Sequence, residues 1–135
     1  MSSGHRNVNP PGWPEPKGYA NGIAARGETL FIAGQIGWNT QGEFEHDDLI
    51  GQFDRALENI VAVLTAAGGK PEHLVRMTVY VTDIDAYRNG LREVGRVWRA
   101  RLGKNFPAMA LVQVVALVER KALVEIEATA VLPSS

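Results

Sequence analysis

Hydrophobic positions recur along the chain with two periods, one typical of strands and one typical of helices. Residues 23–25 and 29–36, separated by a polar turn, are expected to form a hairpin. Leu74–Val81 alternates apolar and polar residues and is expected to be a strand. Residues 47–67 and 83–102 carry apolar side chains every three or four positions, as on one face of a helix.

The last two apolar segments differ in their pattern. Residues 106–118 are apolar at both parities, and a strand of that kind must be covered on both faces. Residues 123–131 alternate, with carboxylates on one face and small apolar side chains on the other. If the two segments pair, a carboxylate of the second would lie beside Met109 and Leu111 of the first.

The order of these elements is ββαβαββ, which predicts an α+β fold with one mixed sheet and two helices on one face. Two helices of this length cover only one face, yet two strands are apolar on both. We therefore expect the uncovered face to pack against copies of the same chain, in an obligate homo-oligomer. Residues 1–16, rich in proline, are expected to form an irregular arm without regular backbone pairing, and residues 17–135 a single domain.

Composition narrows the function classes. The 135 residues are 45% hydrophobic and 21% charged, with a net charge of -1, which gives no electrostatic reason to expect nucleic acid or an anionic membrane as a partner. No segment reaches the ~20 apolar residues of a membrane span, so the expectation is a soluble, cytoplasmic protein. The absence of cysteine excludes a disulfide, a thiolate metal site and a cysteine nucleophile. A serine triad is not expected either, because the only serines are terminal: Ser2, Ser3, Ser134 and Ser135.

Two further sets of polar side chains are interpreted as ordinary surface groups. The histidines lack partners at metal-ligand spacing, so no metal site is expected; they are His5, His46 and His73. An arginine ladder on the second expected helix suggests RNA binding, but no aromatic residues are interleaved with it for base stacking. We interpret it as a solvated basic face, made of Arg88, Arg92, Arg96 and Arg99.

Glu125 and Glu127 have two open interpretations. On an edge strand they would be solvent-facing surface residues. If their face is an oligomer interface, at least one carboxylate loses solvent, which disfavours its charged form and suits it to proton transfer. Strand spacing alone does not separate these alternatives.

Seven segments of the chain, in order and at family spacing, resemble the Rid/YjgF family. They are residues 17–19 (KGY), 30–36 (LFIAGQI), Gln52 with 57–60 (LENI), 66–68 (AAG), 75–83 (VRMTVYVTD), 106–108 (FPA) and 124–128 (VEIEA). The resemblance covers nearly the whole chain beyond the arm. It implies a chorismate-mutase-like fold in a homotrimer, with small-molecule pockets in the clefts between subunits.

The same resemblance implies an activity. The best-known members hydrolyse imines and enamines such as 2-aminoacrylate to keto acids and ammonia, without metal or cofactor. Related members deaminate compounds such as 2-aminomuconate, and some have been described as ribonucleases.

The chain departs from the imine-hydrolysing pattern at four positions. Met109 stands where those members carry the arginine that clamps the substrate carboxylate, and methionine offers none of its hydrogen-bond donors. Leu111 replaces a frequent cysteine, Leu91 an asparagine and Ala33 a serine. These changes favour a ligand that is larger or uncharged, or one anchored by other groups.

The resemblance retains Tyr19, Gly34 and Glu125. Glu125 and Tyr19 are the expected catalytic residues: Glu125 would handle the protons of the attacking water, and Tyr19 would close the pocket. The expected substrate-binding residues are Ala33, Gly34, Met109, Ala110 and Leu111.

Three functions follow from these features. The first is hydrolytic deamination of an imine or enamine other than 2-aminoacrylate. The alternative is a trimer that binds a metabolite without turning it over. The replacement of the clamping arginine by Met109 is the reason for considering it. A ribonuclease is the weakest of the three, because the composition is slightly acidic and no pair of catalytic bases is evident.

Overall fold

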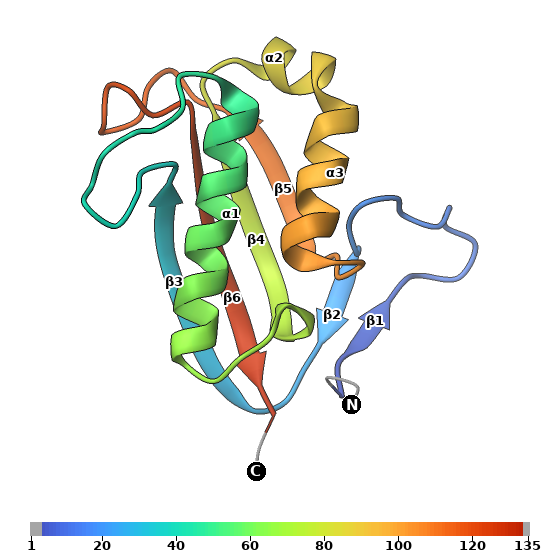
Figure 1. Ribbon diagram of the computed structural model, residues 1–135. Helices are drawn as coiled ribbons and strands as arrows, with labels where there is room; N and C mark the ends of the chain where they lie inside the picture. Colours follow the sequence, from blue (N-terminus) through green and yellow to red (C-terminus); the bar gives the residue numbers. More distant parts are fainter. Residues whose placement is uncertain (1–3, 134–135) are drawn as a thin grey trace.

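A four-stranded mixed sheet carries helices on one face only (Figure 1). The computed structural model describes residues 4–133. The strand order is β3-β6-β4-β5, with β3 at Glu28–Ile36, β6 at Val124–Leu132, β4 at Leu74–Val81 and β5 at Ala108–Gln113. Strand β6 runs antiparallel to both its neighbours, and β5 runs parallel to β4. The predicted α+β class with a mixed sheet is confirmed.

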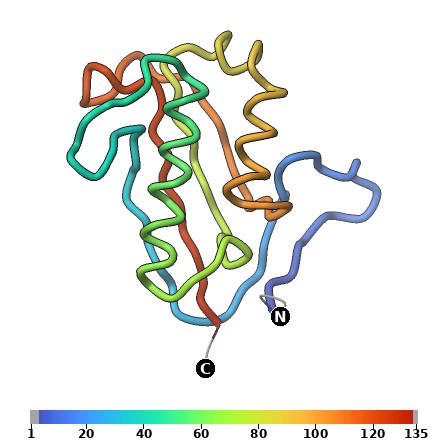
Figure 2. Tube along the Cα trace, viewed as in Figure 1, coloured from blue at the N-terminus to red at the C-terminus, as the bar shows by residue number. Residues whose placement is uncertain are grey.

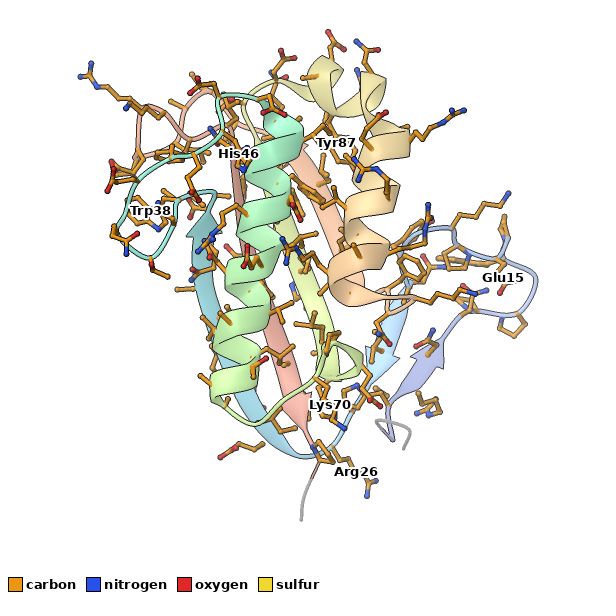
Figure 3. The ribbon with its side chains drawn as sticks, viewed as in Figure 1. Glu15, Arg26, Trp38, His46, Lys70 and Tyr87 are labelled. Atoms are coloured by element: carbon orange, nitrogen blue, oxygen red, sulfur yellow. The ribbon has the colours of Figure 1, made fainter. Side chains whose placement is uncertain are left out.

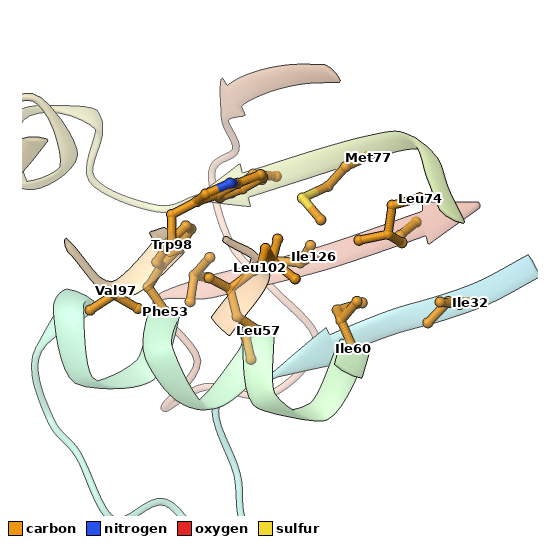
Figure 4. Packing of buried hydrophobic residues seen from close by; sticks show 14 of the residues in the cluster. Ile32, Phe53, Leu57, Ile60, Leu74, Met77, Val97, Trp98, Leu102 and Ile126 are labelled. Carbon is orange, nitrogen blue, oxygen red and sulfur yellow. The ribbon is translucent and has the colours of Figure 1, made fainter. Parts of the chain in front are cut away.

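Helix α1, Leu49–Ala66, confirms the helix expected over residues 47–67. Asp48 caps it by accepting a hydrogen bond from the Gly51 N–H at 2.9 Å. Its buried stripe faces the sheet and α3, and Figure 4 shows the resulting core. Within residues 4–133, no helix combines the length and the apolar character that a membrane crossing requires.

The helix expected over residues 83–102 is two helices, α2 at Ile84–Asn89 and α3 at Leu91–Leu102. The helix is interrupted at Gly90, whose N–H donates a hydrogen bond to the Tyr87 carbonyl at 3.0 Å. Leu91, the first residue of α3, is 56% exposed. Burial of this element begins further along α3, with Val94, Val97, Trp98 and Leu102.

The expected hairpin over residues 23–25 and 29–36 is wrong. Strand β2, Gly22–Ala24, pairs instead with β1, Arg6–Val8, in a separate two-stranded sheet. This pairing also corrects the expectation of an arm without regular backbone pairing. Strand β3 finds its antiparallel partner in β6, about a hundred residues away in the chain.

The two closing segments do not pair with each other, because β6 lies between β3 and β4, and β5 pairs with β4. In the observed register Met77 lies opposite Met109 and Val79 opposite Leu111, on the face that the helices cover. Glu125 belongs to the other face of the sheet. No carboxylate of β6 therefore lies beside Met109 and Leu111 within one chain.

A short 3₁₀ helix, η1 at Pro71–His73, leads into β4 and holds a buried histidine. The His73 Nδ1 accepts a hydrogen bond from the Lys70 N–H at 2.9 Å, and the residue is only 7% exposed. Burial lowers the pKa of His73, and the nearby Glu72 carboxylate opposes that effect. The folded state therefore favours neutral His73.

Gln52, on the first turn of α1, holds two loops against the helix: the loop between β3 and α1, and the loop between β5 and β6. Its Nε2 donates to the His46 and Lys121 carbonyls at 3.0 Å, and its Oε1 accepts from the Leu123 N–H at 2.8 Å. The side chain is 1% exposed, so each of these bonds is made away from solvent. The two loops lie beside the first turns of α1 (Figure 2).

Replacing Gln52 by leucine removes the side-chain partner of three backbone groups in partly buried positions. We expect Gln52→Leu to lower the free energy of unfolding by about 2–3 kcal/mol, measured by urea denaturation. Ala62→Gln, on the exposed side of the same helix, is the control. A leucine variant within about 0.5 kcal/mol of the parent would contradict this role.

The lowered pKa of His73 predicts a pH-dependent stability. The unfolded chain takes up the proton more readily, so stability is complete above the ordinary histidine pKa of about 6.5 and falls as pH drops below it. His73→Asn, which keeps an acceptor and loses the titration, should lose less stability between about pH 7.5 and pH 5. Equal losses in parent and variant, measured by urea denaturation, would refute the assignment.

Candidate functional site

An apolar pocket of the described chain lies between α3 and the edge strand β5. It has a volume of about 540 Å³, within the roughly 300–1,000 Å³ of small-molecule sites. Its lining is mostly apolar and aromatic, including Phe53, Tyr87, Leu91, Trp98, Phe106, Met109 and Leu111.

Two of the expected substrate-binding residues, Met109 and Leu111, form the floor of this pocket. They reach it because alternate residues of β5 face the helices. Ala110 points to the other face and is exposed, so it does not line the pocket.

Tyr19 lies on the rim. The Ala20 N–H donates to the Pro107 carbonyl at 3.1 Å, which fixes the preceding Lys17–Gly18–Tyr19 segment against the start of β5. Tyr19 is 43% exposed and lines the pocket together with Met109. The structure thus brings one expected catalytic residue to two expected binding residues.

The aromatic wall of the pocket is held rigidly. Trp98 and Phe106 stack with ring centroids 6.0 Å apart, and the Trp98 Nε1–H donates to the Asn105 carbonyl at 3.2 Å. Tyr87 extends from α2 near the end of β5 (Figure 3), and burial raises its pKa, which keeps the phenol protonated.

Glu125 lies elsewhere, on the face of the sheet that no helix covers. It is half-buried, and its carboxylate occupies the space that a side chain at Gly34 would take. Among residues 4–133 no lysine, arginine or histidine makes an ion pair with it. Ala33, the neighbour of Gly34, is exposed on β3.

Tyr80 links Glu125 to the sheet edge. In the strand register it lies opposite Glu125 of β6 on one side and Val112 of β5 on the other. Its hydroxyl donates to the Glu127 Oε1 at 3.0 Å, and that hydrogen bond is the main cause that raises the pKa of Tyr80. Sequence reasoning did not single out Tyr80, although its parity on β4 is that of the polar face.

The expected site residues therefore fall into two groups on opposite faces of the sheet. Tyr19, Met109 and Leu111 share the pocket, whereas Glu125 and Gly34 are in contact on the other face. One chain does not bring the two groups together.

Two cations at the pocket were missed as site residues. Arg99 and Lys17 both line it, and no acidic residue does. Arg99 was assigned to a solvated ladder because helical spacing shows the face of a side chain but not the cavity beside it.

Two other kinds of site considered from the sequence were a metal site and a serine triad. In residues 4–133 no three histidine, aspartate or glutamate side chains are grouped to hold a metal ion. The serines considered for a triad, Ser2, Ser3, Ser134 and Ser135, lie outside the described residues.

Comparison with known proteins identifies the family. The family model described as Endoribonuclease L-PSP matches residues 14–132. A RutC family protein of Pyrococcus horikoshii is 38% identical over 119 residues, which are 87% of this chain and 90% of that protein. The 2-iminobutanoate/2-iminopropanoate deaminase of Homo sapiens is 34% identical over 104 residues, 76% of this chain and 72% of the enzyme.

A solved structure shows the same fold. A member of the conserved Rid protein family from Yersinia pestis superposes with a TM-score of 0.83 at 34% identity, over 95% of this chain and 98% of that one. With the family match over most of its length, the chain belongs to the Rid/YjgF family of small-molecule-binding proteins.

Proposed function

We propose that this protein is a homotrimeric deaminase that hydrolyses an imine or enamine other than 2-aminoacrylate. The observation that carries the proposal is the half-buried Glu125, which lies over Gly34 on an uncovered sheet face and makes no ion pair with a cation among residues 4–133. The relatives named 2-iminobutanoate/2-iminopropanoate deaminase supply the reaction type.

A trimer packed through the open face of the sheet would bring the two groups of residues together. The row formed by Glu125, Tyr80 and Val112 runs across that face to the edge strand β5. The pocket lies at the same edge, over the helix-covered side of β5. A neighbouring chain seated there would present its Glu125 to the mouth of this pocket, and each cleft would combine two subunits.

The chemistry needs one group that moves protons and one that binds the substrate. Glu125 takes a proton from water as the water oxygen attacks the imine carbon, and returns it to the nitrogen. The hydroxyl proton of the resulting carbinolamine then passes to the nitrogen through Glu125 as the C–N bond breaks, and the products are ammonia and a carbonyl compound. An enamine first accepts a proton on carbon to give the same imine. Tyr19, on the pocket rim, donates a hydrogen bond to the bound molecule.

Met109 is the argument against 2-aminoacrylate as the substrate. A small substrate that is mostly carboxylate needs a planar donor fork close to the reacting carbon, and a thioether supplies none. The floor formed by Met109 and Leu111 favours an apolar body instead. An aromatic-derived compound such as 2-aminomuconate fits this description better.

Replacing the proton-handling carboxylate should abolish turnover. Glu125→Gln is expected to lower ammonia release by at least about 100-fold, measured over a panel of aliphatic and aromatic imines that includes 2-aminomuconate. Glu127→Gln, two residues along the same strand, is the matched control and should retain activity. A Glu125→Gln variant as active as the parent, or no ammonia from any imine with the parent, would overturn the proposal.

Restoring a fork of donors at position 109 should change specificity. Met109→Arg is expected to gain hydrolysis of 2-aminoacrylate that the parent lacks, whereas Met109→Lys, with a charge but no planar fork, should gain less. Equal inactivity of the parent and both variants on 2-aminoacrylate would show that the carboxylate clamp is not what this pocket is missing.

A further inference from the structure

We propose that Arg99, supported by Lys17, is the anion clamp of the pocket, and that the ligand is a carboxylate with a flat, conjugated or aromatic body larger than that of 2-aminoacrylate. The inference deepens the proposed function by naming the substrate class. Only the hydrolysis of this ligand rests on the proposed function. Its binding does not, because the pocket can bind such a molecule whether or not it is turned over.

The first observation is the charge at the pocket. Arg99 and Lys17 are its charged lining residues, and no aspartate or glutamate is among them. In the part of the chain that the structure describes, neither cation makes an ion pair, whereas Arg55, Arg88 and Arg101 all do. Their charge is available to an anion.

The second observation is the direction of Arg99. Its Nη1 and Nη2 atoms lie 3.6 and 3.9 Å from the position that a Cβ on Gly95 would take, so the side chain lies back along α3 over Gly95. Gly95 itself lines the pocket. The guanidinium thus lies at the pocket instead of extending away from the helix, and its fork of N–H donors suits a planar carboxylate.

The third observation is the apolar surface beside these cations. Leu91 is 56% exposed and Phe106 is 37% exposed, and both line the pocket. Phe106 stacks on Trp98, which gives a flat aromatic wall for a planar ligand. Exposed apolar surface around a cavity is typical of a binding site.

These positions suggest an orientation for the ligand. The cation on α3 lies across the pocket from the β5 floor, so the carboxylate would sit toward the helix and the body over Met109 and Leu111. The volume of about 540 Å³ leaves room for a ring or a conjugated chain beside the carboxylate.

The test compares an acid with its neutral amide. We would measure by isothermal titration calorimetry the binding of 3-phenylpropanoate and 3-phenylpropanamide to the parent, to Arg99→Gln and to Arg96→Gln. Arg96, an exposed arginine on the same helix, does not line the pocket and serves as the control. Because neither substitution touches the core, both variants should fold.

We expect the parent and Arg96→Gln to bind the acid at least about 10-fold more tightly than the amide, as charge-assisted hydrogen bonds predict. Arg99→Gln should lose most of this preference by weakening acid binding alone, and Lys17→Gln should reduce it less. Added salt should weaken binding of the acid and not of the amide.

The proposal is overturned if the parent shows no preference for the acid, if Arg99→Gln keeps it, or if neither probe binds at millimolar concentration. The measurement is independent of ammonia release. Acid-selective binding without deamination would refute the proposed reaction and keep the clamp, and deamination without the Arg99-dependent preference would do the reverse.

Discussion

The structure depends on a mismatch between one sheet and the helices available to cover it. Helices α1 and α3 bury the inner face, where Met77, Val79 and Ile126 are fully shielded from solvent. The outer face has no such cover. It carries Phe31, 79% exposed, on the edge strand β3, in the row that crosses β6 at Thr129 and β4 at Arg76. Burying such an exposed apolar ring in a contact between chains would stabilise the assembly by roughly 25 cal/mol per Å² of apolar surface.

That mismatch also explains why the site residues are divided. A pocket that used both groups within one chain would have to cross the sheet, which is filled by side chains. Association through the outer face removes this difficulty, since the edge strand β5 of one subunit borders both its own pocket and the outer face. On this proposal, oligomerisation and the assembly of the active site are the same event.

The sequence predicted those elements whose signal is local. The stripe of α1 and the alternation of Leu74–Val81 each depend on neighbouring residues only, and both elements are confirmed. Partner choice between strands is not local, so the expected hairpin before β3 was wrong, and the local pattern left open whether the last two segments pair; they do not. Without the sheet order, the parity of Met109 and Leu111 could not be assigned to a face.

Retention of Tyr19, Gly34 and Glu125 pointed to site residues, but not to their division between two faces. Arg99 was missed because its role depends on the cavity beside α3 and on the absence of a side chain at Gly95.

The most direct test of this account is the mass of the protein in solution. Static light scattering at low micromolar concentration should give about 44 kDa, three times the 14.7 kDa of one chain. Phe31→Glu, which places a charge on the open face, should shift this mass toward a single chain. A parent protein that scatters as a 14.7 kDa monomer would contradict the account.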